Sequence, residues 1–340
     1  MSRRRWLAVA LSAAVLASPH LAYAEDGQAA TEQCLVLDPR IVEGSGLVAT
    51  EDGYRIVNDG GEHVTVFRLD HSCAVTGTTE AAIDPYDVED LALGPDGSLW
   101  LADIGDNRIA RASVAIIVVP DEPGAVTGAL RRLQYPDGPR DAESMIVDDE
   151  GRAIVLTKTF SGVVGVYRSQ PIDLSPDGST APQPLEKLGE FQLPETGTAG
   201  GPLGPPLDNL MATGAARCAD MVALRTYTDV HVLRGADPAT AIFTEPVATA
   251  ALPVQQQGES VSFTRPSCDA VVVHGEGSGV PIHRVALPHH DDDDSVLRAP
   301  TAAESPAATS RTEVVIVLAG ALAAAGLLLT WLLRRRRPGR

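Results

Sequence analysis

The sequence predicts an all-β protein with a β-propeller fold, because one hairpin pattern recurs along it. Each copy is a short apolar run, a turn and a second apolar run that ends in polar residues. Asp-Gly or Glu-Gly lies at the centre of three copies, at residues 52–53, 96–97 and 150–151, and supplies the conformations that a tight hairpin needs. The copies recur about every 45 to 70 residues, as propeller blades do. They begin at Glu43, Glu89, Glu143, Thr213 and Glu259.

Five or six blades both fit this spacing. The copies that begin at Glu89 and Glu143 are 54 residues apart, but 71 residues separate Glu143 from Gly214. The longer span holds either a degenerate further blade or a long insertion, and its many Pro and Gly residues indicate loop. The segment from Cys34 to His290 has room for one propeller and too few residues for two domains with separate cores.

The first 24 residues have the features of a secretory signal peptide. Residues 3–5 are arginines, an apolar stretch follows, and residues 22–24 form a small-x-small end, so cleavage is expected before Glu25. The arginines are compatible with general secretion and with twin-arginine export, and the sequence leaves both routes open.

Residues 314–333 form an apolar run of 20 residues, the length of a helix that spans the hydrocarbon of a bilayer. The basic segment 334–340 follows it, and the positive-inside rule places this tail in the cytoplasm. The ectodomain, residues 25–288, is then extracellular, and the acidic low-complexity segment 289–313 forms a stalk. The sequence therefore predicts a single-pass protein of the cell membrane.

The chain carries 45 acidic and 27 basic residues, a net charge of −18. Such a surface repels nucleic acid and attracts cations, so nucleic-acid binding is excluded from the expected functions. Most of the acids are expected to be solvated surface groups, and those at the repeat positions are the exception.

Four cysteines in an exported domain predict two disulfides. The expected pairs are Cys34–Cys73, which bracket the first blade, and Cys218–Cys268, which occupy the turn regions of two hairpins. The sequence alone leaves all pairings of the four open.

Glutamates recur at the start of the hairpins, where the strands of a propeller approach its axis. Glu43, Glu89, Glu143 and Glu259 hold this position, so their carboxylates are expected to share one channel. Carboxylates confined together repel one another, and a divalent cation relieves that repulsion. The repeat therefore predicts a calcium site in the channel.

A further acidic group surrounds the second hairpin. Asp87, Glu89 and Asp90 lie before its first strand, and Asp103, Asp106 and Asn107 come after its second strand. A hairpin brings its two ends together, so these oxygens are expected to converge as calcium ligands. The alternative is that the Asp and Asn side chains build turns by hydrogen bonding to nearby backbone groups.

The same segments resemble a known group of proteins. Their sequences are "EGSGLVAT", "EDLALGPDGSLWLADIGDN", "PDGPRDAESMIVD", "VALRTYTD" and "QGESVSF". They resemble motifs of exported bacterial propellers described as phytase-like or esterase-like, over residues 36–279. More distantly, the blade-leading glutamates are similar to those of the calcium-binding channel in gluconolactonase-type and paraoxonase-type propellers. The resemblance implies six blades and a channel that can hold a cation, and it implies no particular substrate.

Two functions follow from these observations. The chain has no G-x-S-x-G nucleophile motif and no HExxH motif, which favours a non-enzymatic module that binds a cell-envelope component or a protein partner at the cell surface. The alternative is a calcium-dependent hydrolase of an ester, lactone or phosphoester. In that alternative a channel carboxylate or His274 is the candidate base, and Arg225 is the candidate group for an anionic part of the substrate. Their structural alternatives are a hydrogen-bonded histidine and an arginine that neutralises the channel carboxylates.

Overall fold

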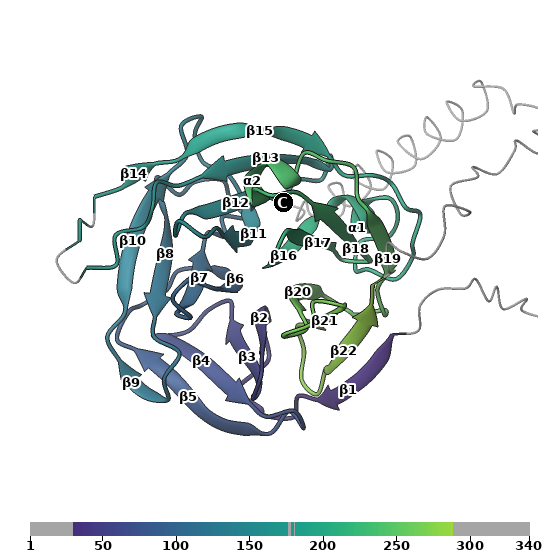
Figure 1. The fold of residues 1–340 in the computed structure, drawn as a ribbon, viewed down its shortest axis with the longest axis horizontal. Coiled ribbons are helices and arrows are strands. Elements are labelled where there is room, and N and C mark those ends of the chain that lie inside the picture. The colour runs from purple at the N-terminus through teal and green to yellow at the C-terminus, as the bar shows by residue number, and fades with distance from the viewer. Residues whose placement is uncertain (1–29, 176–177, 180, 288–340) are drawn as a thin grey trace, which may run out of the picture. The chain divides into compact units, whose positions relative to one another are not determined.

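The structure is a computed structural model that describes residues 30–175, 178–179 and 181–287. Its strands form five sheets arranged around a central axis, as the blades of a propeller (Figure 1). The predicted all-β propeller fold is therefore confirmed with five blades, and the expectation of six blades is wrong.

The first four blades each begin with the strand nearest the axis and continue outward (Figure 1). The first blade contains β2 (Gly44–Thr50), β3 (Gly53–Asn58), β4 (Val64–Leu69) and β5 (Val75–Ala81). The second contains β6 (Val88–Leu93), β7 (Leu99–Asp103), β8 (Val114–Val119) and β10 (Ala129–Gln134). The third contains β11 (Ala142–Val147), β12 (Ala153–Thr157), β13 (Val163–Arg168) and β15 (Glu186–Gln192). The fourth contains β16 (Ala212–Cys218), β17 (Met221–Thr226), β18 (Asp229–Arg234) and β19 (Ala248–Ala251).

The first described strand, β1 (Thr31–Leu35), closes the ring by completing the fifth blade. The fifth blade contains β20 (Gly258–Phe263), β21 (Ala270–Gly275) and β22 (Pro281–Ala286), and its outermost strand is β1. Strand β1 runs antiparallel to β22, so Thr31 lies opposite Arg284. The first and last described strands therefore complete one sheet.

Two short strands extend the outer edges of the first two blades. Strand β9 (Gly124–Val126) pairs in parallel with β5, and β14 (Gln183–Pro184) pairs in parallel with β10. The connection that contains β14, together with the long strand β15, accounts for the wide sequence spacing between the third and fourth hairpins. Within the described residues this span contains loop, β14, β15 and the short helix α1 (Leu207–Leu210), and no sixth blade. The other short helix, α2 (Pro238–Ala241), precedes β19.

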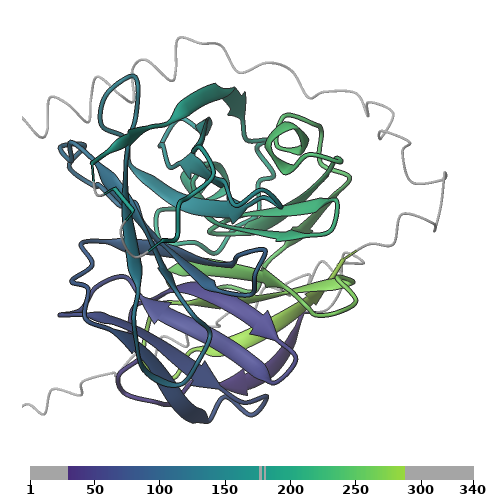
Figure 2. The ribbon, with the colours of Figure 1, turned by 60° about the vertical axis from the view of Figure 1, so that its left-hand side comes forward.

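The apolar core is divided into five clusters, one between each pair of neighbouring blades. Trp100 of the second blade and Tyr167 of the third belong to one such cluster. Seen obliquely in Figure 2, the blades are separate twisted sheets stacked around the axis. The runs of buried residues in β8, β11 and β12 reflect this packing, because both faces of a blade contact a neighbour.

The predicted hairpin turns and disulfides are both present. Gly53, Gly97 and Gly151 have φ of 137°, 82° and 70°, which only glycine adopts readily. Cys34 of β1 is bonded to Cys73 in the first blade, and Cys218 of the fourth blade is bonded to Cys268 in the fifth. Both expected cysteine pairs are therefore confirmed, and each joins two blades.

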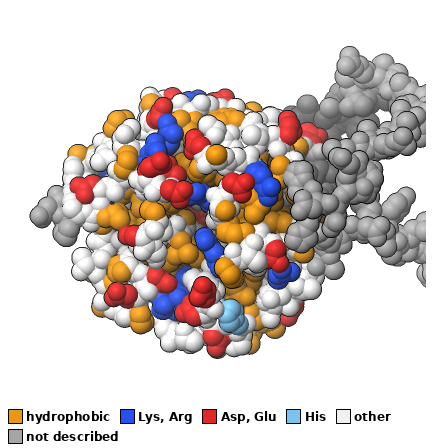
Figure 3. Space-filling model, viewed as in Figure 1, with side chains coloured by type: hydrophobic (Ala, Val, Ile, Leu, Met, Phe, Trp, Pro, Cys, Tyr) orange, Lys and Arg blue, Asp and Glu red, His pale blue; other side chains and the backbone are white. Residues whose placement is uncertain are grey.

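Acidic and basic side chains are mixed over the face of the propeller seen in Figure 3. Several ion pairs among the described residues also join blades or connections. Arg217 of the fourth blade, for example, lies 2.7 Å from Asp149 in the third.

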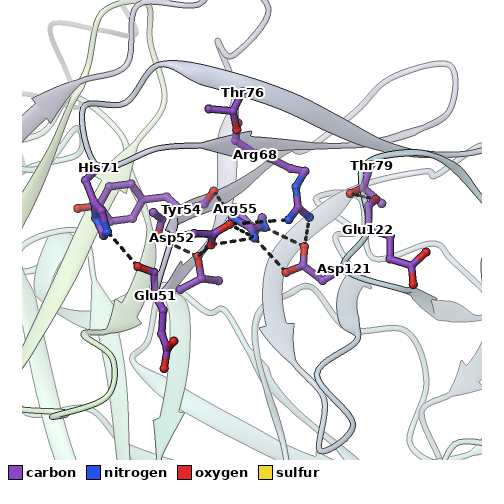
Figure 4. Close-up of polar contacts among 12 residues, drawn as sticks. Glu51, Asp52, Tyr54, Arg55, Arg68, His71, Thr76, Thr79, Asp121 and Glu122 are labelled. Carbon is purple, nitrogen blue, oxygen red and sulfur yellow. Dashed lines mark hydrogen bonds and ion pairs between the residues drawn. The ribbon is translucent and has the colours of Figure 1, made fainter.

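An ion-pair cluster fixes the connection that leads to β9 (Figure 4). Asp121, which lies just before β9, binds both Arg55 of β3 and Arg68 of β4. Arg55 also binds Asp52 at 3.0 Å. The Arg55 side chain is only 3% exposed, and its two partners differ, because Asp52 is 66% exposed and Asp121 only 20%, so solvent weakens the pair with Asp121 less. The cluster ties a segment of the second blade to the first blade.

Asp121→Ala is expected to lower the free energy of unfolding by about 2–3 kcal/mol, because it leaves the buried Arg55 guanidinium without its main partner. Asp52→Ala, which removes an exposed partner, is expected to lower it by less than about 1 kcal/mol. Urea denaturation of both variants measures the difference. Equal losses would show that Asp121 is as solvent-screened as Asp52.

The predicted signal peptide, stalk, transmembrane helix and basic tail all lie outside the described residues. Between residues 30 and 287, as far as these are described, no helix is long and apolar enough to cross a membrane.

Candidate functional site

Every inner strand carries a β-bulge at its second residue. A bulge inserts one extra residue into a strand and redirects its side chain. Because the five inner strands surround the axis, the bulges form a ring where these strands begin, and all five side chains are buried. The bulged residues are Ser45, Glu89, Glu143, Thr213 and Glu259.

Three of the four predicted glutamates therefore share one structural position, and Glu43 does not. Its equivalent in the ring is Ser45, because the bulge of β2 falls between Gly44 and Gly46. Glu43 precedes the strand and is exposed. Its carboxylate still lies close enough to Asp59 to raise the pKa of that group, so it contributes to the rim of the channel.

Lys158 is the cation that the chain itself places in this ring. It follows β12, and its ammonium donates a hydrogen bond to Oε1 of Glu143. The Tyr227 ring lies 5.3 Å from the Lys158 nitrogen. Burial acts to lower the pKa of Lys158, but the carboxylates of Glu143 and Glu259 outweigh burial and raise it. Lys158 is therefore charged and offsets part of the acidic ring.

Glu89 and Asp87 form an acidic pair beside Lys158. Both carboxylates crowd the Cα of Gly105, where any Cβ would collide with them. Burial, together with the charges of Glu143 and Asp87, raises the pKa of Glu89 to about 10. Burial also raises the pKa of Asp87, although Arg111 opposes it. With this raised pKa the Glu89 carboxyl holds its proton at neutral pH unless a cation approaches.

Two more carboxyls at the rim have a pKa close to neutrality. Burial and the neighbouring Glu43 raise the pKa of Asp59 to about 7. Burial and Glu259 raise the pKa of Glu276 to about 7, and Gln257 donates a hydrogen bond to Glu276 at 2.8 Å.

We name this end of the channel the channel mouth. Burial also raises the pKa of Glu143 and of Glu259. Oε2 of Glu143 is buried and has no hydrogen-bond partner among the described residues. The mouth thus holds seven acids and the Lys158 ammonium, and the guanidinium groups of Arg111 and Arg225 act on two of these acids from nearby. Its members are Glu43, Asp59, Asp87, Glu89, Glu143, Glu259, Glu276 and Lys158.

The structure does not show the predicted calcium site. In the part of the chain that is described, no group of three or more His, Cys, Asp or Glu side chains is arranged to hold a metal ion. The Glu89 and Asp87 carboxylates lie together beside Gly105. One oxygen of Glu143 has no hydrogen-bond partner among the described residues, and the other binds the Lys158 ammonium.

Asp90 lies deeper in the channel and is fully buried. Its Oδ2 accepts hydrogen bonds from the backbone N–H of Met145 at 2.8 Å and of Ala215 at 3.1 Å, and its Oδ1 accepts one from Leu91 at 2.8 Å. These N–H groups belong to three different inner strands. Burial raises the pKa of Asp90 to about 8, and the three N–H donors oppose that shift. The contacts of Asp90 bridge blades across the channel.

The small residues of the other blades make room for Asp90. Its equivalents at the same level of the inner strands are Gly46, Ser144, Gly214 and Ser260. One larger acceptor therefore fills a space surrounded by small residues and free backbone donors.

Asp103 and Asp106 have the contacts of turn-building residues, the alternative to calcium ligation. Asp103 accepts hydrogen bonds from the backbone of Asp87 and pairs with Arg111 at 2.8 Å. Asp106 accepts two backbone hydrogen bonds, from Ala110 and Arg111, both at 2.7 Å. Asn107 is exposed in the same loop. The calcium role of these three residues stays a prediction.

His274 and Arg225 occupy equivalent positions on the second strands of their blades, one level below the ring. Arg225 is fully buried and donates to the backbone oxygens of Ser260 at 2.6 Å and of His274 at 2.7 Å, and to the side chain of Gln255. Burial lowers the pKa of His274 to about 4. Their contacts are those of buried structural groups, and their catalytic roles stay predictions.

Four residues of the site were not found from the sequence as site residues. Asp59, Lys158, Tyr227 and Glu276 each come directly after the second strand of a hairpin. Aligning the hairpins at that strand end, rather than at the leading glutamate, would have placed them together.

No protein-family model and no curated protein matches the chain. Similar solved structures include aldose sugar dehydrogenase from Streptomyces coelicolor with bound PQQ, at 11% identity and a TM-score of 0.41, covering 78% of this chain and 99% of that one. Glutaminyl cyclase from Myxococcus xanthus has 11% identity and a TM-score of 0.41, covering 76% and 97%. A streptogramin B lyase has 12% identity and a TM-score of 0.40, covering 77% and 99%. These distant similarities concern the propeller fold and carry no argument about function.

Proposed function

We propose that the protein is a binding module of the cell surface that takes a cation into the channel mouth. The observation that carries the proposal is the excess of the seven carboxyls of the mouth, three of them buried, over the cations that act on them, which are Lys158, Arg111 and Arg225. Buried carboxyls without partners are unfavourable, and they are relieved either by protonation or by a bound cation. The cation is calcium or a charged group of a cell-envelope component or protein partner.

Glu89, Asp87 and the free oxygen of Glu143 are the groups that would hold the cation. They supply several carboxylate oxygens, which calcium prefers, and their raised pKa values mean that binding releases protons. Lys158 lies beside them and limits the charge that can enter. The predicted signal peptide and anchor would present this mouth outside the cell.

A binding role is favoured over catalysis by the state of the two candidate catalytic residues. His274 and Arg225 are both almost fully buried, and the Arg225 donors are used on backbone and on Gln255. A fold alone implies no activity.

The second candidate, a calcium-dependent hydrolase, is favoured by the pKa values near 7 of Asp59 and Glu276. Groups with such pKa values serve well as general bases near neutral pH. Bound calcium would supply polarisation of the ester, lactone or phosphoester oxygen. Asp59 or Glu276 would accept the proton of the attacking water, which His274, with a pKa of about 4, is less suited to do.

Thermal melting of the purified full-length protein with calcium and with chelator tests the proposal. Calcium at a hundredfold excess over its dissociation constant is expected to stabilise the fold by about 2.7 kcal/mol. Glu89→Gln is expected to reduce this effect. Glu245→Gln, at an exposed site outside the mouth, is expected to leave it unchanged.

Parallel melts with spermidine distinguish calcium from an organic cation. Stabilisation by spermidine and not by calcium would assign the mouth to a charged group of a larger ligand. No response to either cation, with Glu89→Gln melting at the same temperature in all buffers, would overturn the proposal. Calcium-dependent turnover of nitrophenyl esters or phosphates that is lost in Asp59→Asn and Glu276→Gln would establish the hydrolase instead.

A further inference from the structure

A second cavity lies on the second blade, separate from the channel mouth. It has a volume of about 540 Å³. Three arginines line it in a chain whose net charge is −18. The lining residues that matter here are Tyr86, Asp103, Asp106, Arg108, Arg111 and Arg132.

The two buried aspartates of this cavity, Asp103 and Asp106, already have hydrogen-bond or ion-pair partners within the protein. Asp103 is paired with Arg111, and it also accepts backbone hydrogen bonds from Tyr86 and Asp87. Asp106 accepts the backbone N–H groups of residues 110 and 111. Both are buried. The third acid of the lining, Asp84, is exposed to solvent. The buried acids therefore do not neutralise the remaining arginines.

Arg108 and Arg132 are exposed and have no carboxylate partner among the described residues. Arg55 and Arg217, by contrast, each bind an aspartate directly. Arg108 donates only to the hydroxyl of Tyr86, at 2.8 Å. Two guanidinium groups that face one cavity without a carboxylate can bind a planar or tetrahedral oxyanion through paired N–H donors.

Tyr86 is held in place although it is 58% exposed. The Arg111 guanidinium lies 4.5 Å from the centre of its ring, and Arg108 binds its hydroxyl. Arg111 is itself fixed by Asp103 and by the backbone oxygen of Gly105. An exposed aromatic ring that is held at both its face and its hydroxyl is a rigid surface for a planar ligand group.

We infer that this cavity binds a small organic anion. Arg108 and Arg132 hold its carboxylate or phosphate group, and Tyr86 supports a planar part of the same molecule. The inference does not depend on the cation site, because it rests on different residues and on the opposite charge.

Titration calorimetry of the purified full-length protein at low salt tests it with four probes, namely inorganic phosphate, acetate, phenyl phosphate and benzoate. The tighter member of each phosphate–carboxylate pair identifies the oxyanion. Phenyl phosphate or benzoate is expected to bind more tightly than its counterpart without a ring. Raising the salt concentration is expected to weaken the binding of every probe to this cavity, because salt screens the attraction between the anion and the arginines.

Arg132→Gln is expected to weaken binding about tenfold, the loss of one charge-assisted contact of about 1.4 kcal/mol. Arg108→Gln is expected to act similarly. Arg234→Gln, at an arginine on the fourth blade outside this cavity, serves as the matched control and should bind as the wild type does. Tyr86→Leu is expected to remove the advantage of the aromatic probes.

Binding that is the same in Arg132→Gln, Arg108→Gln and wild type would place the anion elsewhere and overturn the inference. Absence of heat with all four probes would do so as well. A response to calcium at the mouth is measured separately by melting, so failure of one site leaves the other testable.

Discussion

Asp90→Ala is expected to lower the free energy of unfolding by about 3–5 kcal/mol, because it leaves buried backbone donors without an acceptor. The Asp90 carboxylate accepts N–H groups from Met145, Ala215 and Leu91. Each unsatisfied buried donor costs about 1–3 kcal/mol. The donors belong to three inner strands, so the loss should loosen three blades at once.

Urea denaturation of Asp90→Ala and Asp90→Asn measures this effect. Asparagine keeps one acceptor oxygen but turns an NH₂ group toward a donor, so its loss should lie between wild type and alanine. Glu89→Gln, at the neighbouring bulge, is the control for substitution in the channel and should not destabilise. An alanine variant as stable as wild type would mean that water in the channel satisfies these donors.

Between pH 5 and pH 8, in chelator, the free energy of unfolding is expected to fall by an amount on the order of 2–4 kcal/mol. The pKa of Asp59 and of Glu276 is raised to about 7, that of Asp90 to about 8 and that of Glu89 to about 10. Groups with a pKa above the unfolded value bind more protons in the folded state. Their stabilising contribution is complete below the unfolded pKa, near 4, and is lost as the pH rises through the folded pKa.

Carboxyls with a lowered pKa reduce the free energy of unfolding at acidic pH. Arg40 holds the pKa of Asp38 at about 2. Burial raises the pKa of Asp137, but Lys187 and Arg140 outweigh burial and bring it to about 2. Their stabilising contributions are present above the unfolded pKa and are lost as the pH falls through the folded value. The stability maximum is therefore expected near pH 5.

Urea midpoints at four pH values between 5 and 8 measure this dependence. Glu89→Gln should be more stable than wild type at pH 8 and should show a shallower pH dependence, because glutamine needs no proton. Glu245→Gln, which is exposed, should match wild type throughout. A pH profile that is flat, or that rises toward pH 8, would show that the mouth is hydrated enough to ionise freely.

The sequence predicted the hairpins and the disulfides but not the number of blades. The Asp-Gly and Glu-Gly turns and the alternation of apolar residues are local signals, and they led to the correct strands. The wide spacing before the fourth blade depends on non-local pairing, since β14 pairs with β10 of another blade. Such pairing leaves no local pattern, so the span was open to interpretation as a sixth blade.

The candidate site was predicted only in part for a similar reason. The leading glutamates suggested one register, but bulges shift side chains by a residue, and the ring position of the first blade is Ser45 rather than Glu43. Thr213 holds the same position in the fourth blade without any acidic signal. Lys158 binds Glu143 within one hairpin, and it was missed because the hairpins were aligned at their leading glutamates rather than at the end of the second strand.

The closure of the ring by β1 has a consequence for how the protein is made. Its partner β22 lies at the other end of the described sequence, and pairing between distant segments is slow. Cys34 and Cys73, separated by 39 residues, are both available much earlier, once the first blade has emerged. Their oxidation fastens β1 beside that blade, where it waits as an open edge. We expect the disulfide to shorten the search by which β1 and β22 pair, so oxidation should speed closure of the ring as well as stabilise the closed ring.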